Sequence, residues 1–170
     1  FSEDFEDAQA AAATWTKVPA NANITFASGE VSLGSTTDIK LTAGDESWDN
    51  YVYEADVKIA TNGNNSGIIF RTTQEGSGAD NYYGYYFGLN STGFEIGKSS
   101  NSWTQLVSKT YDVHPGSYHR LKVMAYNSNF KFYIDDVLVH SMKDGTHAAG
   151  KIGLRGYNRS FTADNVMVRT

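Results

Sequence analysis

The chain has 170 residues and a mass of 18.7 kDa, which is the size of one ordinary domain with a substantial core. The net charge of −5 and the pI near 5.3 provide no basic surface for nucleic acid, and the absence of cysteine excludes disulfides, thiol catalysis and cysteine-based zinc sites. Hydrophobic residues make up 40% and charged residues 19%, so disorder is not expected, and no apolar run is long enough to span a membrane.

In chain order, the first periodic segment is short. Residues 8–13 are rich in alanine but have no apolar face, so we expect a loop or a single helical turn there. From residue 51 onward, apolar residues alternate with polar ones with a period of two, which is typical of half-buried β-strands. The alternating runs lie at 51–59, 67–71, 94–96, 120–125, 130–134 and 152–155.

Turn signals separate these runs at short intervals, for example at 62–65, 115–116 and 135–136. Residues 118–142 therefore read as a three-stranded meander with tight turns. Many short strands without crossover helices predict an all-β fold, an antiparallel β-sandwich that forms a single domain over residues 1–170.

The alternation also predicts which side chains face away from the core. Strand glycines often mark a close approach by a ligand or another backbone, and several fall on the outward side. These outward glycines are Gly67, Gly84, Gly88, Gly97 and Gly153. The same pattern exposes Tyr82 and Tyr86, so we expect a shallow glycine floor with polar and aromatic residues around it.

The residues expected around this floor are Arg71, Tyr82, Tyr86, Glu95, Arg155 and Tyr157, with Trp103 in a polar loop at the end of one strand. Aromatic rings cover the apolar faces of sugars, and charged planar groups hydrogen-bond pairs of hydroxyls. The set therefore favours a sugar site. The alternative is an ordinary polar strand face with exposed tyrosines.

No pattern in the sequence indicates catalysis. Glu54 and Asp56 point to the same side of one strand, but Lys58 follows where a third acid is wanted, so we interpret them as a solvated face. The four histidines show no metal-binding spacing, and His119 is expected to be a hydrogen-bonded structural residue. We therefore expect no enzyme. The amino-terminal acids together with Asp164 could hold calcium, or they could simply form a solvated acidic surface.

Four stretches in chain order resemble the concanavalin A-like, laminin-G-like sandwich modules of bacterial glycoside hydrolases. Residues 67–71 read GIIFR, residues 80–88 read DNYYGYYFG, residues 118–123 read YHRLKV and residues 150–155 read GKIGLR. The nearest named group is carbohydrate-binding module family 66, which occurs beside exo-levanases. This resemblance covers nearly the whole chain.

The resemblance implies a jelly roll without catalysis that binds a polysaccharide or oligosaccharide, such as the terminal fructose of levan. It implies Arg71 as a ligand contact, and a structural calcium held by Glu3 or Asp4, by Gly29 and by Asp164. We accordingly expect a secreted, monomeric module from a larger bacterial glycoside hydrolase, with no nucleic-acid or membrane partner. Two alternatives remain open, a hydrolase or lyase on the same fold and a calcium-dependent protein-adhesion module of laminin-G type.

Overall fold

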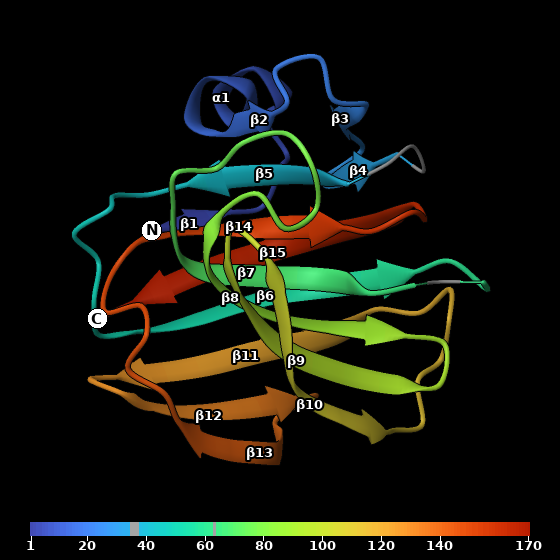
Figure 1. Ribbon diagram of the computed structural model, residues 1–170. Coiled ribbons are helices and arrows are strands. Elements are labelled where there is room, and N and C mark those ends of the chain that lie inside the picture. Colours follow the sequence, from blue (N-terminus) through green and yellow to red (C-terminus); the bar gives the residue numbers. More distant parts are fainter. Residues whose placement is uncertain (35–37, 63) are drawn as a thin grey trace.

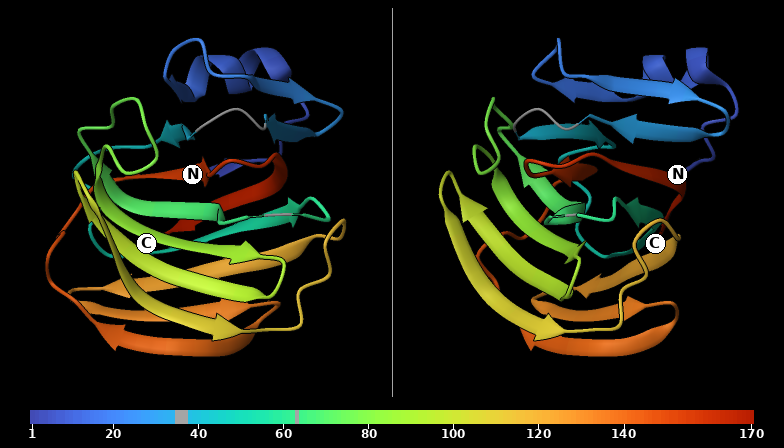
Figure 2. Two further views of the ribbon diagram at one scale, coloured as in Figure 1. Left: turned by 45° about the vertical axis from the view of Figure 1, so that its right-hand side comes forward. Right: turned by 90° about the vertical axis from the view of Figure 1, so that its right-hand side faces the viewer.

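The computed structural model describes residues 1–34, 38–62 and 64–170 and shows two antiparallel sheets packed face to face (Figures 1 and 2). Sheet A has the order β13 (Val137–Lys143), β12 (Asn129–Ile134), β11 (His119–Tyr126), β6 (Tyr51–Ile59), β15 (Phe161–Arg169), β4 (Glu30–Leu33) and β3 (Ile24–Ala27), and β1 (Ser2–Glu3) also pairs with β15. Sheet B has the order β10 (Trp103–Thr110), β9 (Gly93–Ser100), β8 (Tyr83–Asn90), β7 (Ser66–Thr73), β14 (Lys151–Gly156), β5 (Ile39–Ala43) and β2 (Thr16–Val18). The predicted all-β antiparallel sandwich is confirmed.

The core lies between the sheets and follows the period of two. On β6 the inward side chains of Tyr53, Ala55 and Val57 are fully buried. Aromatic rings join the two layers, with Phe87 on β8 and Phe132 on β12 having centroids 5.1 Å apart in an edge-to-face arrangement. Apolar burial between the sheets therefore holds the sandwich together.

The predicted meander is confirmed, because β11, β12 and β13 pair consecutively. The turn between β12 and β13 has positive φ at both Asp135 (49°) and Asp136 (64°), as a two-residue hairpin requires.

The amino-terminal prediction is wrong. Residues 8–14 form a helix, α1 (Ala8–Thr14), rather than a loop or a single turn. The Asp7 carboxylate accepts hydrogen bonds from the backbone N–H groups of Gln9 and Ala10, each at 3.0 Å, and so caps the helix. Alanine has the highest helix propensity, and burial of Ala11 supplies enough packing without a wide apolar stripe.

The two chain ends lie on the same side of the sandwich (Figure 1). Two hydrogen bonds join them: the Phe1 amino group donates to the Val168 carbonyl at 3.1 Å, and the Val168 N–H donates to the Phe1 carbonyl at 2.8 Å. In the part of the chain that the structure describes, no helix is long and apolar enough to cross a membrane.

Candidate functional site

The register of sheet B brings several of the predicted site residues together on its outer face. Gly67 on β7 lies opposite Arg155 on β14 and opposite Gly88 on β8. Gly88 in turn lies opposite Glu95 on β9. Arg155 and Glu95 are therefore separated only by two glycines, in a row that crosses four strands.

Arg155 lies at the centre of this group. Its guanidinium carbon lies 4.8 Å from the ring centroid of Tyr86, 5.4 Å from that of Trp103 and 5.8 Å from that of Tyr157. Arg155 is only 4% exposed, whereas Tyr157 is 39% exposed and Trp103 is partly exposed. Three aromatic rings thus surround a positive charge, and two of them reach the solvent.

The loop formed by residues 74–82, between β7 and β8, folds over one side of this face and is fastened to it. The Arg155 Nε donates to the Ala79 carbonyl at 3.1 Å, and its Nη2 bonds the Asp80 carboxylate at 2.8 Å. The Ser99 hydroxyl donates to the Asp80 carbonyl, and the Lys40 ammonium donates to the Gly78 carbonyl. The loop therefore forms a fixed wall beside Arg155.

Sequence reasoning missed Lys40 and Asp80. Lys40 is fully buried beneath the 74–82 loop, 5.7 Å from the Tyr82 ring centroid, and burial followed by the positive charge of Arg155 lowers its pKa to about 8. A signal for Lys40 was present, because polar Lys40 and Thr42 alternate with apolar neighbours in residues 39–43. Nothing local in the sequence indicated that Asp80 pairs with Arg155.

The prediction that Tyr82 and Tyr86 are exposed is wrong. Tyr86 faces outward from sheet B and Tyr82 lies in the 74–82 loop, but both are fully buried, with Ile69, in a small cluster against which Trp103 packs. Among the described residues neither hydroxyl has a hydrogen-bond partner, and burial raises the pKa of both well above the usual tyrosine value. The 74–82 loop and the Trp103 and Arg155 side chains supply the cover that the alternation pattern could not reveal.

The expected bare glycine floor is also occupied by the protein itself. The Trp103 ring lies against Gly97, so closely that a Cβ there would overlap it. The Tyr86 hydroxyl occupies the corresponding space at Gly88. These glycines therefore make room for the protein's own aromatic rings, and the surface open to a ligand is formed by ring edges and charged groups instead.

Glu95 supplies a carboxylate at the open side of the group. Burial raises its pKa, while the charge of Arg155 and a hydrogen bond from Asn65 oppose that shift. Glu95 is partly exposed, so it can accept hydrogen bonds from a ligand hydroxyl.

Arg71 does not belong to this face, and its predicted placement there is wrong. The pairing of β7 with β8 shifts between Phe70 and Thr73, and Arg71 has φ +52° in that bulge. The extra residue breaks the alternation, so the side chain turns into the open end of the sandwich, where its guanidinium carbon lies 5.1 Å from the Phe130 ring centroid.

In this position Arg71 joins two loops by hydrogen bonds, one loop at Asp49 and the other at His147. Its Nε and Nη2 donate to the Asp49 carbonyl at 3.1 and 2.6 Å, and its Nη1 donates to the His147 carbonyl at 3.1 Å. Arg71 is 1% exposed, yet it reaches the base of a 530 Å³ cavity that Ser47, Asn127 and neighbouring loop residues line.

The residues proposed for calcium lie near the amino terminus and β15. Both Glu3 oxygens are already engaged, by the Phe5 N–H at 2.9 Å and by the Trp15 indole N–H at 3.3 Å, so Glu3 is poorly suited as a ligand. Gly29 lies against the carboxylate of Glu6, one of the amino-terminal acids considered as a metal ligand from the sequence, although the family resemblance does not imply it.

Asp164 lies among other acids. Its pKa is raised by burial and then by the negative charges of Asp56, Asp4 and Glu6. The oxygen donors have the chemistry that calcium prefers. Within the described ranges, however, no three acidic or histidine side chains are close enough together to hold a metal ion.

One of two interpretations of the remaining polar residues is confirmed. Glu54 and Asp56 lie on the outer side of β6, where Arg169 and Arg120 pair with them at 3.2 and 2.9 Å, but Glu54 is only 8% exposed, so the predicted solvated face is wrong for Glu54. His119 is 5% exposed; its Nδ1 lies 2.7 Å from Asp135, and its Nε2 accepts the His114 N–H at 3.0 Å.

One protein-family model matches almost the whole chain. The model of the 3-keto-alpha-glucoside-1,2-lyase-like domain matches residues 3–169. A search of curated proteins gave no match.

Solved structures share the fold. The carbohydrate-binding module CBM66 from Bacillus subtilis has a TM-score of 0.77 at 22% identity, with 92% of this chain and 96% of that chain covered. The β-glucanase of Bacillus licheniformis has a TM-score of 0.68 at 16% identity, covering 100% and 97%. Domain 4 of AbnA, a GH43 extracellular arabinanase from Geobacillus stearothermophilus in complex with arabinotriose, has a TM-score of 0.60 at 17% identity, covering 91% and 81%. The resemblance to family 66 modules and the jelly-roll fold stated from the sequence are confirmed.

Proposed function

We propose that this chain, which belongs to the 3-keto-alpha-glucoside-1,2-lyase-like domain family, binds a carbohydrate on the outer face of sheet B. The observation that carries the proposal is the group around Arg155, in which a positive charge lies within 5.8 Å of three ring centroids. Trp103 and Tyr157 offer ring surface to the apolar side of a sugar. Glu95 and the Asp80 carboxylate accept bonds from its hydroxyls.

The site is built for binding with little rearrangement. Arg155 is held by the 74–82 loop and Trp103 is held against Gly97, so few rotors become fixed when a sugar docks. One or two sugar rings bind weakly on such a surface, and attachment to a hydrolase or to repeated ligands supplies avidity.

The finer features of the proposal come from the resemblance and the related structures. We propose terminal fructose of levan as the preferred sugar, and a secreted, monomeric module that directs an attached glycoside hydrolase to its polysaccharide. The similarity to a domain of an extracellular arabinanase supports the attachment and makes arabinan the first competing ligand.

Calorimetric titration tests this site. We expect Trp103→Ala and Tyr157→Ala to weaken binding to levan oligosaccharides or to arabinotriose by at least about tenfold, because each removes ring contact with the sugar. Tyr126→Ala is the matched control, since Tyr126 is 67% exposed on sheet A. If fructans, arabinans, β-glucans and galactans all fail to bind, or if both variants keep full affinity, the proposal is wrong.

A second candidate function is cleavage of a glycosidic bond, which the lyase-like description of the family favours. Burial raises the pKa of the Glu95 carboxyl, against the opposing charge of Arg155, and a partly exposed carboxyl group is the type of side chain that serves as a general acid or base. Incubation with a 3-keto-α-glucoside and with the same polysaccharides distinguishes the two functions. New reducing ends or unsaturated products that are lost in Glu95→Gln would establish catalysis, whereas intact substrate together with binding in the calorimetric titration would establish binding without cleavage.

A further inference from the structure

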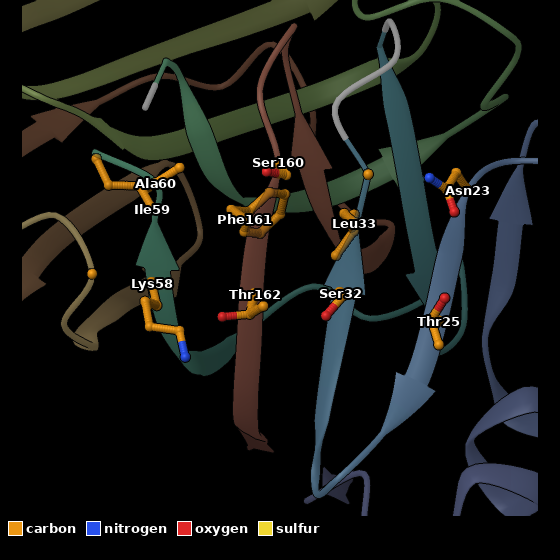
Figure 3. Close-up of a pocket in the computed structure, with 12 residues that line it drawn as sticks. Asn23, Thr25, Ser32, Leu33, Lys58, Ile59, Ala60, Ser160, Phe161 and Thr162 are labelled. Atoms are coloured by element: carbon orange, nitrogen blue, oxygen red, sulfur yellow. The ribbon is translucent and has the colours of Figure 1, made fainter. Parts of the chain in front are cut away.

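The outer faces of the two sheets differ in what they offer a ligand. A hollow of 540 Å³ on the outer side of sheet A is lined by Thr25 and Ser32, which lie on neighbouring strands (Figure 3). Its charged side chain, Lys58, is paired with Glu30 at 3.4 Å. On sheet B, by contrast, the partly exposed acid Glu95 lies on β9. We therefore expect selection of a ligand by charge on sheet B.

Glu95 points away from the core of the sandwich. Its neighbours along β9, Phe94 and Ile96, belong to the core, so the alternation of the strand turns Glu95 outward. The positive charge of Arg155 acts on Glu95, but Arg155 is itself paired with the Asp80 carboxylate at 2.8 Å. The negative charge of Glu95 is therefore only partly compensated by its surroundings in the described part of the chain.

Two asparagines form a hydrogen-bonded relay that ends at this carboxylate. The Thr92 backbone N–H and hydroxyl both donate to the Asn90 Oδ1, each at 3.0 Å. Because a backbone N–H can only donate, this contact fixes the orientation of the Asn90 amide. Its Nδ2 then donates to the Asn65 Oδ1 at 3.2 Å. The Asn65 Nδ2 is left to donate to Glu95, so the relay has one direction only.

The relay favours the ionised form of Glu95. Burial raises the pKa of Glu95, whereas the charge of Arg155 and the hydrogen bond from Asn65 lower it. The buried Tyr86 hydroxyl, whose ionisation the charge of Glu95 opposes, stays neutral because burial keeps its pKa well above the usual value. A carboxylate accepts several hydrogen bonds, so Glu95 can bond ligand hydroxyls as well as the Asn65 amide. An acidic ligand would instead bring a like charge to this carboxylate.

We propose that Asn65 and Asn90 are positioning residues that hold Glu95 oriented and ionised, and that Glu95 thereby makes the outer face of sheet B selective for neutral glycans. Hydroxyl groups of a neutral glycan donate to the oriented carboxylate, whereas the carboxylates of an acidic glycan are repelled by it. The two asparagines act through Glu95 and need no contact with the glycan. This inference rests on the proposed function, because it defines the ligand class of the same face.

An NMR titration of the Glu95 carboxyl carbon, in the intact chain without ligand, tests the relay. We expect Asn65→Ala to move the pH midpoint of this signal upward, because the ionised carboxylate loses a hydrogen bond. Asn90→Ala should move it in the same direction, since the Asn65 amide then loses its fixed orientation. The matched control is Asn23→Ala, an exposed asparagine at the hollow on sheet A (Figure 3), which should leave the midpoint unchanged. An unchanged midpoint in Asn65→Ala would refute the positioning roles.

Calorimetric titration tests the selectivity, with levan oligosaccharides and arabinotriose as neutral probes and digalacturonate as the acidic probe. The wild type should bind a neutral probe at least about tenfold more tightly than digalacturonate, Asn65→Ala should weaken neutral binding by about three- to tenfold, and Glu95→Gln should reduce the preference to about threefold or less. Equal binding of neutral and acidic probes by the wild type, or full preference in Glu95→Gln, would overturn the selectivity. Binding of no saccharide would overturn the proposed function and the selectivity with it, whereas the Glu95 midpoint decides the positioning roles separately.

Discussion

Arg71 shows how one residue can be chemically suited to a ligand and yet serve the fold. All three guanidinium nitrogens donate to backbone carbonyls of two loops, at Asp49 and His147, and the group is almost fully buried. We expect Arg71→Ala to lower the free energy of unfolding by about 2–4 kcal/mol, because buried carbonyls lose charged donors and packing on Phe130 is lost.

Urea denaturation measures this change. Lys131→Ala is the matched control, since Lys131 is a cationic residue exposed on β12, and it should change stability by less than about 0.5 kcal/mol. Sugar binding on sheet B should survive in Arg71→Ala at temperatures where the variant is folded. Unchanged stability with complete loss of sugar binding would instead support the ligand contact that the family resemblance implies.

Arg71 and Arg155 also show where the alternation of apolar and polar residues stops predicting the position of a side chain. Alternation correctly placed Gly67 and Ile69 on the outer side of β7, but Arg71 comes directly after them, in the bulge. A bulge depends on how two strands align, and one extra residue reverses every later side chain. Arg155 was correctly placed on the outer face, while its partner Asp80 comes from a loop whose path depends on tertiary contacts.

At the scale of elements, the 74–82 loop gives sheet B a pH-sensitive contact. Lys40 is buried beneath this loop, and its pKa is lowered from 10.5 to about 8 in the folded protein. Between these two pKa values the unfolded chain binds more protons than the folded chain, so this group makes stability rise with pH in that window. Below about pH 8 the buried Lys40 is charged, and its charge then lowers the free energy of unfolding by the full amount.

The variant Lys40→Met isolates this contribution. From pH 7 to pH 10, we expect the free energy of unfolding of the wild type to rise by roughly 1–3 kcal/mol relative to that of Lys40→Met, at about 1.4 kcal/mol for each unit of pKa difference. Chemical denaturation at several pH values measures the difference. Lys17→Met serves as a control on neighbouring β2 and should give parallel curves. Parallel curves for Lys40→Met as well would show that the Lys40 charge is not destabilised in the fold.

The strands themselves were largely predictable, because a two-layer sandwich buries one side of each strand and so requires a period of two. Segments that depend on other elements were not. The short helix α1 depends on its Asp7 cap and on a packing site for Ala11, and the cover over Tyr82 and Tyr86 depends on the 74–82 loop. The alternation pattern predicts which side chains point away from the core, but it does not predict which loops or other side chains cover that outer face.

At the scale of the whole molecule, the amino-terminal segment and β15 bring like charges together. Asp164 is partly buried near Asp56, Asp4 and Glu6, and these neighbours help to raise its pKa. A divalent cation would relieve this repulsion and tie the first strand to the last, which already share hydrogen bonds at the chain ends. Although no three acidic side chains of the described residues lie close enough together to hold a metal ion, the family resemblance implies calcium here, and we propose that calcium raises the melting temperature of the wild type by about 3–6 °C, reversibly with a chelator.

Asp164→Asn separates calcium binding from simple charge effects. Without calcium, this variant should be at least as stable as the wild type, because it removes a negative charge from a repulsive group. With calcium, it should show little further stabilisation, since the proposed ligand has been lost. Asp112→Asn is the control, because its carboxylate is 91% exposed and lies outside this group. Thermal unfolding of the three proteins with and without calcium decides the matter: an equal calcium response in the wild type and Asp164→Asn, or none in the wild type, would mean that backbone pairing alone joins the ends of the sandwich.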